Sequence, residues 1–128
     1  DVVIAADTIV VCGGRILGKP GTEERAAEML RLLSGRDQQV MTGFTVRRGS
    51  TVLTQTEVSH IFFRPLDEGE IDAYVATGEP LDKAGAYGVQ GLGALLVERL
   101  DGDFFNVMGL PVLRLSRMLE RFGVHFFC

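Results

Sequence analysis

Residues 78–91 read GEPLDKAGAYGVQG, a stretch with neither the period of a helix nor the alternation of a strand. Its four glycines would let backbone amides approach a ligand closely, and Lys83 would supply a compact positive charge. Asp82 could hold a metal ion or orient that lysine. The alternative interpretation is a tight connection around a buried ion pair. Because the stretch alone favours neither, the choice depends on residues elsewhere in the chain.

The composition predicts one folded domain across residues 1–128. Apolar residues make up 46% of the chain, which is enough for one substantial core. The net charge of −4 argues against a protein that binds duplex nucleic acid, because phosphate binding over a wide face needs a basic surplus. No apolar run approaches the roughly 18 residues of a membrane span. Cys12 and Cys128 match no zinc or CxxC spacing, so we expect thiols in a reducing, cytoplasmic compartment.

The first residues indicate that a preceding segment is missing. Asp1 has no methionine before it, and an apolar, β-branched run at residues 2–12 follows at once. We expect this run to be a buried strand, apolar on both faces. It contains Asp7, and a carboxylate inside such a strand is costly unless it is paired or binds a metal ion. The alternative is an acid at a strand end that caps a turn, and this stretch alone leaves the two readings equal.

A second candidate position follows the first strand. Gly13-Gly14 predicts a hairpin turn into a short strand at residues 15–17. In Gly18-Lys19-Pro20, the fixed backbone of the proline would hold Lys19 at a strand end, which suits a phosphate contact. The alternative is an exposed lysine in a turn, and the three residues alone favour that alternative.

The middle of the chain reads as scaffold. Thr22 predicts the N-cap of a helix that ends at Gly35 and buries Ala26, Met29, Leu30 and Leu33. Strands are expected at residues 39–48 and 51–64, with polar faces that carry Thr42, Thr45, Thr54, Thr56 and His60. A capping-box pair, Asp67 and Glu70, predicts a second helix that ends at Gly78 and buries Ile71, Tyr74 and Val75.

The last third is expected to contain a strand at residues 94–100, a final helix after the entry segment 106–111, and a short strand at 124–127. The inward face of that helix is expected to comprise Val112, Leu115, Leu119 and Phe122. Helices and strands alternate without strict βαβ order, which predicts an α/β fold of the α+β kind with a mixed sheet and helices packed against it. A cleft at its loops and strand ends would collect Asp7, Lys19 and residues 82–90.

Five segments together resemble the Maf family. They are AADTIV at 5–10, ILGKP at 16–20, MLRLLSGR at 29–36, TGEPLDKAGAYGVQG at 77–91 and FNVMGLP at 105–111. Their order and spacing match across nearly the whole chain. Maf proteins, once called septum formation inhibitors, are understood as nucleoside triphosphate pyrophosphatases. The resemblance therefore implies the Maf/Ham1-like (ITPase-like) α/β fold with a cleft between two lobes.

The resemblance also implies a reaction. A nucleoside triphosphate would be hydrolysed between the α and β phosphates, with Mg²⁺ or Mn²⁺, to the monophosphate and pyrophosphate. Asp7 corresponds to the general base for the attacking water and would lie near the metal ion. Lys19 and Lys83 correspond to phosphate-side lysines, and Asp82 to the acid of the DKAG segment. Such groups neutralise polyphosphate charge while a carboxylate deprotonates water.

The combination of Thr8 and Gln90 resembles the pattern of the branch of the family that hydrolyses dTTP and UTP. Modified pyrimidine nucleotides are further candidate substrates. The branch acting on 7-methyl-GTP has a different loop, and an amide at Gln90 can both donate to and accept from a pyrimidine edge. The chain departs from the family pattern in two places. The N-terminal Ser-x-Ser-Pro-Arg-Arg motif, expected to bind phosphates, is absent, and Gln38 stands near the place of a histidine usual after SGR.

A second hypothesis is a nucleotide-binding regulator of cell division that does not turn substrate over. It is motivated by the absent motif and by the historical name of the family. The coding sequence upstream of Asp1 would discriminate, because an encoded Ser-x-Ser-Pro-Arg-Arg favours the enzyme. The resemblance also allows a homodimer, to which Phe126 and Phe127 could contribute.

Overall fold

The computed structural model describes residues 1–127, and Cys128 lies outside them. Within these residues the strands are β1 (Val3–Cys12), β2 (Arg15–Leu17), β3 (Asp37–Arg48), β4 (Thr51–Phe63) and β5 (Val97–Asp101). The α-helices are α1 (Glu23–Leu33), α2 (Glu68–Ala76), α3 (Phe104–Val107) and α4 (Val112–Glu120). Short 3-10 helices, η1 (Glu79–Asp82), η2 (Ala84–Ala86) and η3 (Leu92–Leu96), occupy much of the glycine-rich stretch and the segment after it.

One five-stranded sheet, in the order β2-β1-β3-β4-β5, forms the frame of the molecule. The predicted combination of a sheet with packed helices is confirmed. Every pairing among the described strands is antiparallel, however, so the expected mixture of strand directions is not found in them. Two-residue turns at Gly13-Gly14 and Gly49-Ser50 join β1 to β2 and β3 to β4, and such turns require antiparallel neighbours.

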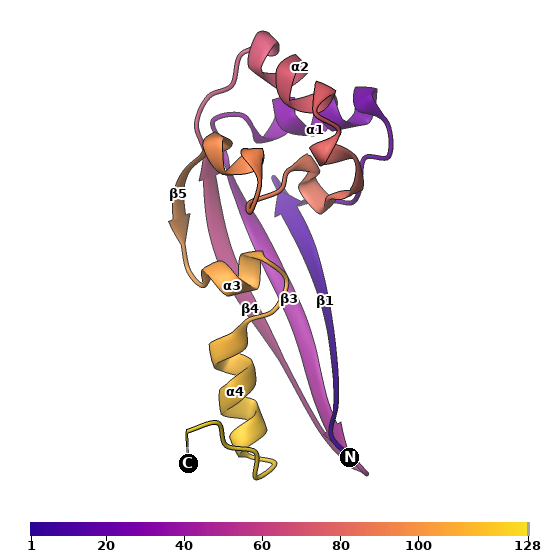
Figure 1. Ribbon diagram of the computed structural model, residues 1–128, viewed down its shortest axis with the longest axis vertical. Coiled ribbons are helices and arrows are strands. Elements are labelled where there is room, and N and C mark those ends of the chain that lie inside the picture. The colour runs from indigo at the N-terminus through magenta and orange to yellow at the C-terminus, as the bar shows by residue number, and fades with distance from the viewer. Residues whose placement is uncertain (128) are drawn as a thin grey trace.

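The helices cover one face of this sheet in two groups. A first hydrophobic core packs α1 and α2 against one end of the strands, on residues such as Val10 and Val40. A second core packs α4 against Phe44 and Val46. In Figure 1, α1 and α2 lie at the top of the sheet, α4 lies beside its lower half, and α3 lies between them. The predicted division into two lobes is therefore confirmed.

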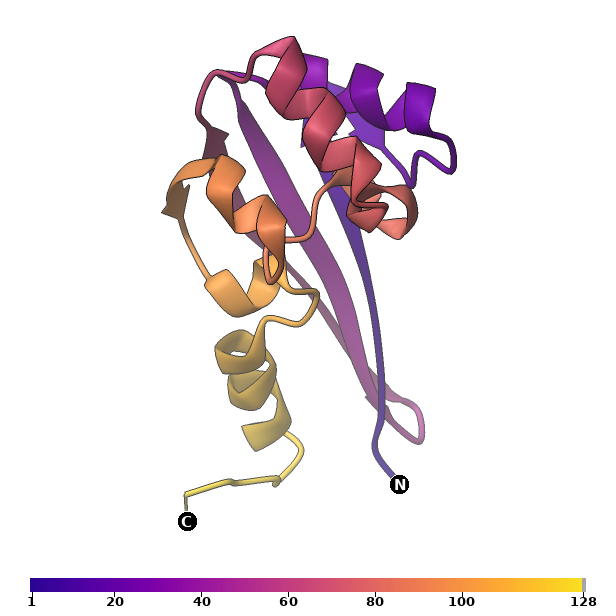
Figure 2. The same ribbon diagram turned by 45° about the horizontal axis from the view of Figure 1, so that its top comes forward.

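The two helices of the first lobe begin at the predicted caps. Thr22 accepts a hydrogen bond from the N–H of Arg25, and Asp67 and Glu70 form the complete capping box. Figure 2 shows α1 and α2 side by side above the ends of the long strands. Their buried faces contain the residues that the helical period predicts, among them Leu30, Leu33, Ile71 and Tyr74.

Replacing Asp67 by alanine is expected to lower the free energy of unfolding by about 1 kcal/mol, because the Asp67 carboxylate no longer accepts from the N–H of Glu70 at the start of α2. Urea denaturation measures this loss. Asp72→Ala is the matched control, because Asp72 is an exposed acid of the same helix outside the cap. An equal loss in both variants would contradict the capping role.

The second face of the sheet carries no helix among the described residues. Residues alternate between the faces along β3, where Val40, Thr42 and Phe44 are buried and their neighbours are only partly so. Residues 3–7 of β1 are exposed, so the prediction of a buried strand is wrong for this half. The reason is that α4 packs on Phe44 and Val46 of β3 instead of on this half of β1. In addition, β2 pairs only with residues 10–12 of β1, which leaves the outer edge of the strand free at Asp7 and Thr8.

Four local predictions are also wrong. Residues 94–96 belong to η3, and the last strand begins only at Val97. Residues 124–127 form no strand, because no partner strand lies beside them in the described sheet. Val112 is 49% exposed at the first turn of α4, although Leu115, Leu119 and Phe122 are buried as expected. Thr42 is fully buried under α3, whereas a position on the polar face was expected.

Candidate functional site

A cleft of about 280 Å³ lies where the two lobes meet over β1 and β3. Its floor contains Thr8 and Val10, and one wall is the segment from Val107 to Gly109. The opposite wall is the glycine-rich stretch, which contributes Lys83 and Gln90. Three of the six residues predicted for the site therefore line one cleft, namely Thr8, Lys83 and Gln90. They come from positions up to 82 residues apart, from Thr8 to Gln90.

Lys19 and Asp82 lie beside this cleft, because the Gly18-Lys19-Pro20 turn is tied to the glycine-rich stretch. The N–H of Gly85 donates to the carbonyl of Gly18 at 3.3 Å, and the N–H of Gly21 donates to the carbonyl of Leu81 at 3.2 Å. The ammonium of Lys83 donates to the Asp82 carboxylate at 2.8 Å. The pKa of Asp82 is lowered first by that hydrogen bond and by the charge of Lys83, with a smaller contribution from Lys19. The three predicted residues thus form one exposed charged group.

The stretch is held against β1 by a close approach that needs glycine. A Cβ atom at Gly85 would lie 3.1 Å from a methyl carbon of Val10, and the φ of Gly85 is 76°. The next residue, Ala86, is fully buried and also has a positive φ, of 67°. A left-handed conformation is unfavourable for alanine, so the surrounding packing must hold it. The backbone before Gln90 is therefore fixed by contacts on both sides.

Thr8 is held by a chain of hydrogen bonds. Its hydroxyl is hydrogen-bonded to the hydroxyl of Thr42 at 2.8 Å, and either of the two can be the donor. The hydroxyl that accepts in this pair is free to donate to a carbonyl of the far wall at 3.4 Å, that of Gly109 for Thr8 or that of Asn106 for Thr42. The buried side-chain amide of Asn106 donates to the carbonyl of Val40 at 3.1 Å and to the hydroxyl of Ser59 at 3.0 Å. These bonds fix the position of α3 over the sheet and the far wall of the cleft.

Asp7 does not line the cleft. It precedes Thr8 in β1, and neighbouring side chains of a strand project from opposite faces, so its side chain belongs to the uncovered face. It is exposed, and no ion pair joins it to another residue of the described chain. Neither interpretation offered for Asp7 is therefore confirmed, because the residue is not buried and lies inside β1 (Val3–Cys12) instead of at a strand end. Because the edge of β1 is unpaired here, a ligand at that edge could contact both Thr8 and Asp7.

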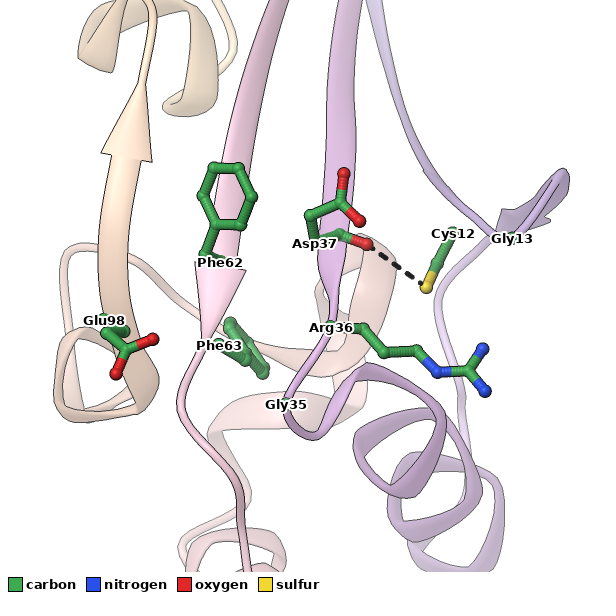
Figure 3. A pocket seen from close by; sticks show the side chains of 8 residues that line it. All are labelled: Cys12, Gly13, Gly35, Arg36, Asp37, Phe62, Phe63 and Glu98. Atoms are coloured by element: carbon green, nitrogen blue, oxygen red, sulfur yellow. Dashed lines mark hydrogen bonds between the residues drawn. The ribbon is translucent and has the colours of Figure 1, made fainter.

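A second hollow, of about 440 Å³, lies at the other side of the first lobe between β1, β3 and β5. Figure 3 shows Cys12, Arg36, Asp37 and Glu98 around it, with the thiol of Cys12 directed to the Asp37 carbonyl. The guanidinium of Arg36 and the carboxylate of Glu98 lie at opposite sides of this view. None of the six predicted site residues lines this hollow, so the cleft at the lobe boundary is the better candidate.

The described residues contain no group of three or more histidine, cysteine or acidic side chains that could enclose a metal ion. Magnesium ions are commonly held by one or two carboxylates together with phosphate oxygens of the substrate. Asp7 is exposed and Asp82 is accessible beside Lys83, so both could serve as such ligands. The donor set therefore fits a cation that arrives with a polyphosphate, and Asp7 is the carboxylate without a competing ammonium.

Sequence reasoning missed Glu79 and Tyr74, which lie behind the glycine-rich stretch. Tyr74 was expected only as a core residue of α2, but its hydroxyl donates to the Glu79 carboxylate. Glu79 in turn accepts from the N–H groups of Leu92 and Gly93, at 3.0 and 2.9 Å. The signal available was a second acid, Glu79, inside the glycine-rich stretch.

Comparison with known proteins identifies the family of this chain. The family model described as "Maf-like protein" matches residues 1–122. This chain belongs to the Maf family. Among its relatives, a Bacillus pumilus protein named dTTP/UTP pyrophosphatase is 55% identical over 126 residues, which cover 96% of this chain and 65% of the relative. A Moorella thermoacetica protein of the same name is 54% identical, and the match covers 95% of this chain and 64% of the relative.

A Methanosarcina mazei protein, also named dTTP/UTP pyrophosphatase, is 48% identical over 128 residues, which cover 98% of this chain and 65% of that protein. This member of the Maf family thus spans about 65% of the length of the curated relatives it matches. No described helix of this chain is both long and apolar enough to cross a membrane.

Proposed function

We propose that this Maf protein hydrolyses dTTP and UTP to the monophosphate and pyrophosphate, and that modified pyrimidine nucleotides are further candidates. The observation that carries the proposal is the cleft shared by Thr8, Lys83 and Gln90, with Lys19 and Asp82 at its side. Relatives named dTTP/UTP pyrophosphatase are 48–55% identical over almost all of this chain, which supports it.

The cleft provides different chemistry at its different walls. Lys83 and Lys19 bring positive charge to one side, where the polyphosphate would bind. Gln90 offers one amide that both donates and accepts, which suits the edge of a pyrimidine. A volume of about 280 Å³ is near the lower end of small-molecule sites. We infer that the base enters the cleft while the phosphates extend along its edge toward Lys19.

In this proposal Asp7 is the general base. Its exposed carboxylate at the free edge of β1 would orient a water molecule and accept its proton as the water attacks the α-phosphorus. Asp7, together with phosphate oxygens, would hold a Mg²⁺ or Mn²⁺ ion, which would neutralise charge that develops on the phosphates. Lys83 would bind the polyphosphate, and Asp82 would keep its ammonium in place.

The proposal is tested by pyrophosphate release across a panel of nucleoside triphosphates with Mg²⁺ or Mn²⁺. Release of pyrophosphate from dTTP and UTP, with the monophosphate as the other product, is expected. Activity confined to purine triphosphates, or orthophosphate as the sole phosphate product, would contradict it. Binding of dTTP without any turnover would favour the second candidate, a nucleotide-binding regulator of cell division.

Replacing Lys83 by alanine is expected to raise the KM for dTTP roughly tenfold, because a charge-assisted phosphate contact is worth about 1.5–3 kcal/mol when made. The melting temperature should stay nearly unchanged, because Lys83 is exposed and its contact with Asp82 is a surface ion pair. Steady-state kinetics and a thermal melt provide the two readouts. Lys83→Arg keeps the charge and is the control, and a KM equal to that of the alanine variant would contradict a charge contact.

We also infer that the protein is cytoplasmic and acts on free nucleotides, without a nucleic-acid partner. The net charge of −4 supports this. A homodimer is a further proposal, supported by exposed apolar residues of the second lobe such as Leu113 and Phe126. Sedimentation of the purified protein distinguishes monomer from dimer.

A further inference from the structure

The carboxylate of Glu79 is enclosed by the backbone of the glycine-rich stretch. It accepts hydrogen bonds from the N–H of Leu92 and of Gly93 and from the hydroxyl of Tyr74. The same Tyr74 hydroxyl accepts from the N–H of Gly88, at 2.9 Å. One side-chain pair, from the end of α2 and the start of η1, thus binds the chain on both sides of Gln90.

The glycines of this segment are required by the approach of these two side chains. A Cβ atom at Gly91 would lie 2.0 Å from Oε1 of Glu79. A Cβ at Gly93 would lie 2.5 Å from the carbonyl oxygen of Gly88 and 2.8 Å from the Tyr74 hydroxyl. Neither of these glycines has a positive φ. Glycine is therefore needed here for space, and the space is taken by Glu79, Tyr74 and the backbone that they hold.

The charge of Glu79 is compensated within this cluster. Burial alone would raise the pKa of Glu79, but hydrogen bonds from Tyr74 and from backbone N–H groups outweigh it, and the pKa is lowered. Burial, followed by the hydrogen bond to Glu79, raises the pKa of Tyr74 above its ordinary value. At neutral pH an ionised carboxylate therefore faces three donors, which are the neutral phenol of Tyr74 and the N–H groups of Leu92 and Gly93. No Lys or Arg is among these hydrogen-bond partners, so the acid acts on the loop backbone.

We propose that Glu79, with Tyr74, is a positioning residue that sets base selectivity by holding residues 88–93 in the conformation that presents Gln90 to the cleft. This inference rests on the proposed function, because it assigns a selective role to the amide of Gln90. Glu79 itself also contributes to the lining of the cleft. A free loop would let Gln90 adopt many orientations, and a single orientation is needed for a pair of hydrogen bonds to discriminate between bases.

Glu79→Gln is the central variant. An amide has one acceptor oxygen and a donor NH₂ group in place of two acceptor oxygens, so it cannot accept from Leu92, Gly93 and Tyr74 together. The ratio of kcat/KM for dTTP to that for dATP is expected to fall about tenfold. Tyr74→Phe, which leaves the carboxylate in place, is expected to lower the ratio in the same direction by a smaller factor. Glu98→Gln, at an exposed acid of β5, should leave the ratio unchanged.

The experiment separates a positioning role from a structural one. General loosening of the fold would lower the melting temperature and reduce turnover of every nucleotide equally, without a change in the ratio. An unchanged ratio in Glu79→Gln overturns the inference. If Glu79→Gln does not fold, Tyr74→Phe decides, and an unchanged ratio there overturns it. If the unsubstituted protein shows no preference for dTTP over dATP, the proposed function fails first, and this outcome is distinct from the others.

Discussion

Asp7→Asn is expected to lower the kcat for dTTP by about two to four orders of magnitude. The amide is nearly isosteric with the carboxylate but cannot accept a proton from water at neutral pH. Asp7 is exposed and lies on the unpaired edge of β1, so the melting temperature should stay unchanged. The alternative of a structural acid would require a loss of stability, for which the exposed position of Asp7 gives no reason. Steady-state kinetics with a parallel thermal melt measures both quantities.

Asp101→Asn is the matched control for this variant. Asp101 is an exposed acid near the end of the same sheet, where it pairs with His60 on the side opposite to the first core. Its replacement changes the net charge by the same amount and should leave the kcat unchanged. If Asp7→Asn retained more than about a tenth of the kcat, the assignment of Asp7 as the base would be abandoned, because a general base contributes more than that.

The sequence predicted most of the scaffold because its signals are local. Thr22, Asp67 and Glu70 specify helix starts through hydrogen bonds within one turn, and the Gly49-Ser50 turn specifies the long hairpin. The wrong predictions concern features that local sequence signals do not determine. Burial along β1 depends on which helices pack on it, and α4 packs on β3 instead of on the first half of β1. A short apolar run at residues 94–100 has no period that separates a 3-10 helix from a strand.

In the candidate site, too, some residues could be predicted from the sequence and others depend on contacts between distant parts of the chain. Lys83 was named from the glycine-rich stretch and Thr8 and Gln90 from the resemblance to the Maf family, and the structure brings all three to one cleft. The exposure of Asp7 could not be predicted, because an acid in an apolar run reads as buried whichever face is covered. The roles of Thr42 and Asn106 depend on α3 lying across β3, at sequence separations of 64 residues and more. No spacing rule within one element reveals such contacts.

Asn106 is the residue whose loss is expected to cost the most stability among the polar contacts of the cleft wall. It is fully buried, and its side-chain amide joins α3 to β3 through the carbonyl of Val40 and to β4 through Ser59 and the carbonyl of Glu57. Asn106→Ala leaves these buried acceptors without their donor. Each buried group that loses its partner costs about 1–3 kcal/mol. Because more than one acceptor is affected, we expect a decrease of about 3 kcal/mol in the free energy of unfolding.

The size of this decrease depends on which side-chain atoms are removed. The Oδ1 atom of Asn106 is buried without a hydrogen-bond partner in the described structure, and its removal relieves part of the loss. Thr54→Ala is the control, because it removes an exposed hydrogen bond to Thr45 in the same hairpin and should cost less than about 1 kcal/mol. Urea denaturation of both variants gives the comparison. Equal losses of stability in the two variants would show that Asn106 does not hold α3 to the sheet. A larger loss for Asn106→Ala, together with a raised KM for dTTP, would show that the cleft wall containing Met108 and Gly109 depends on this buried amide.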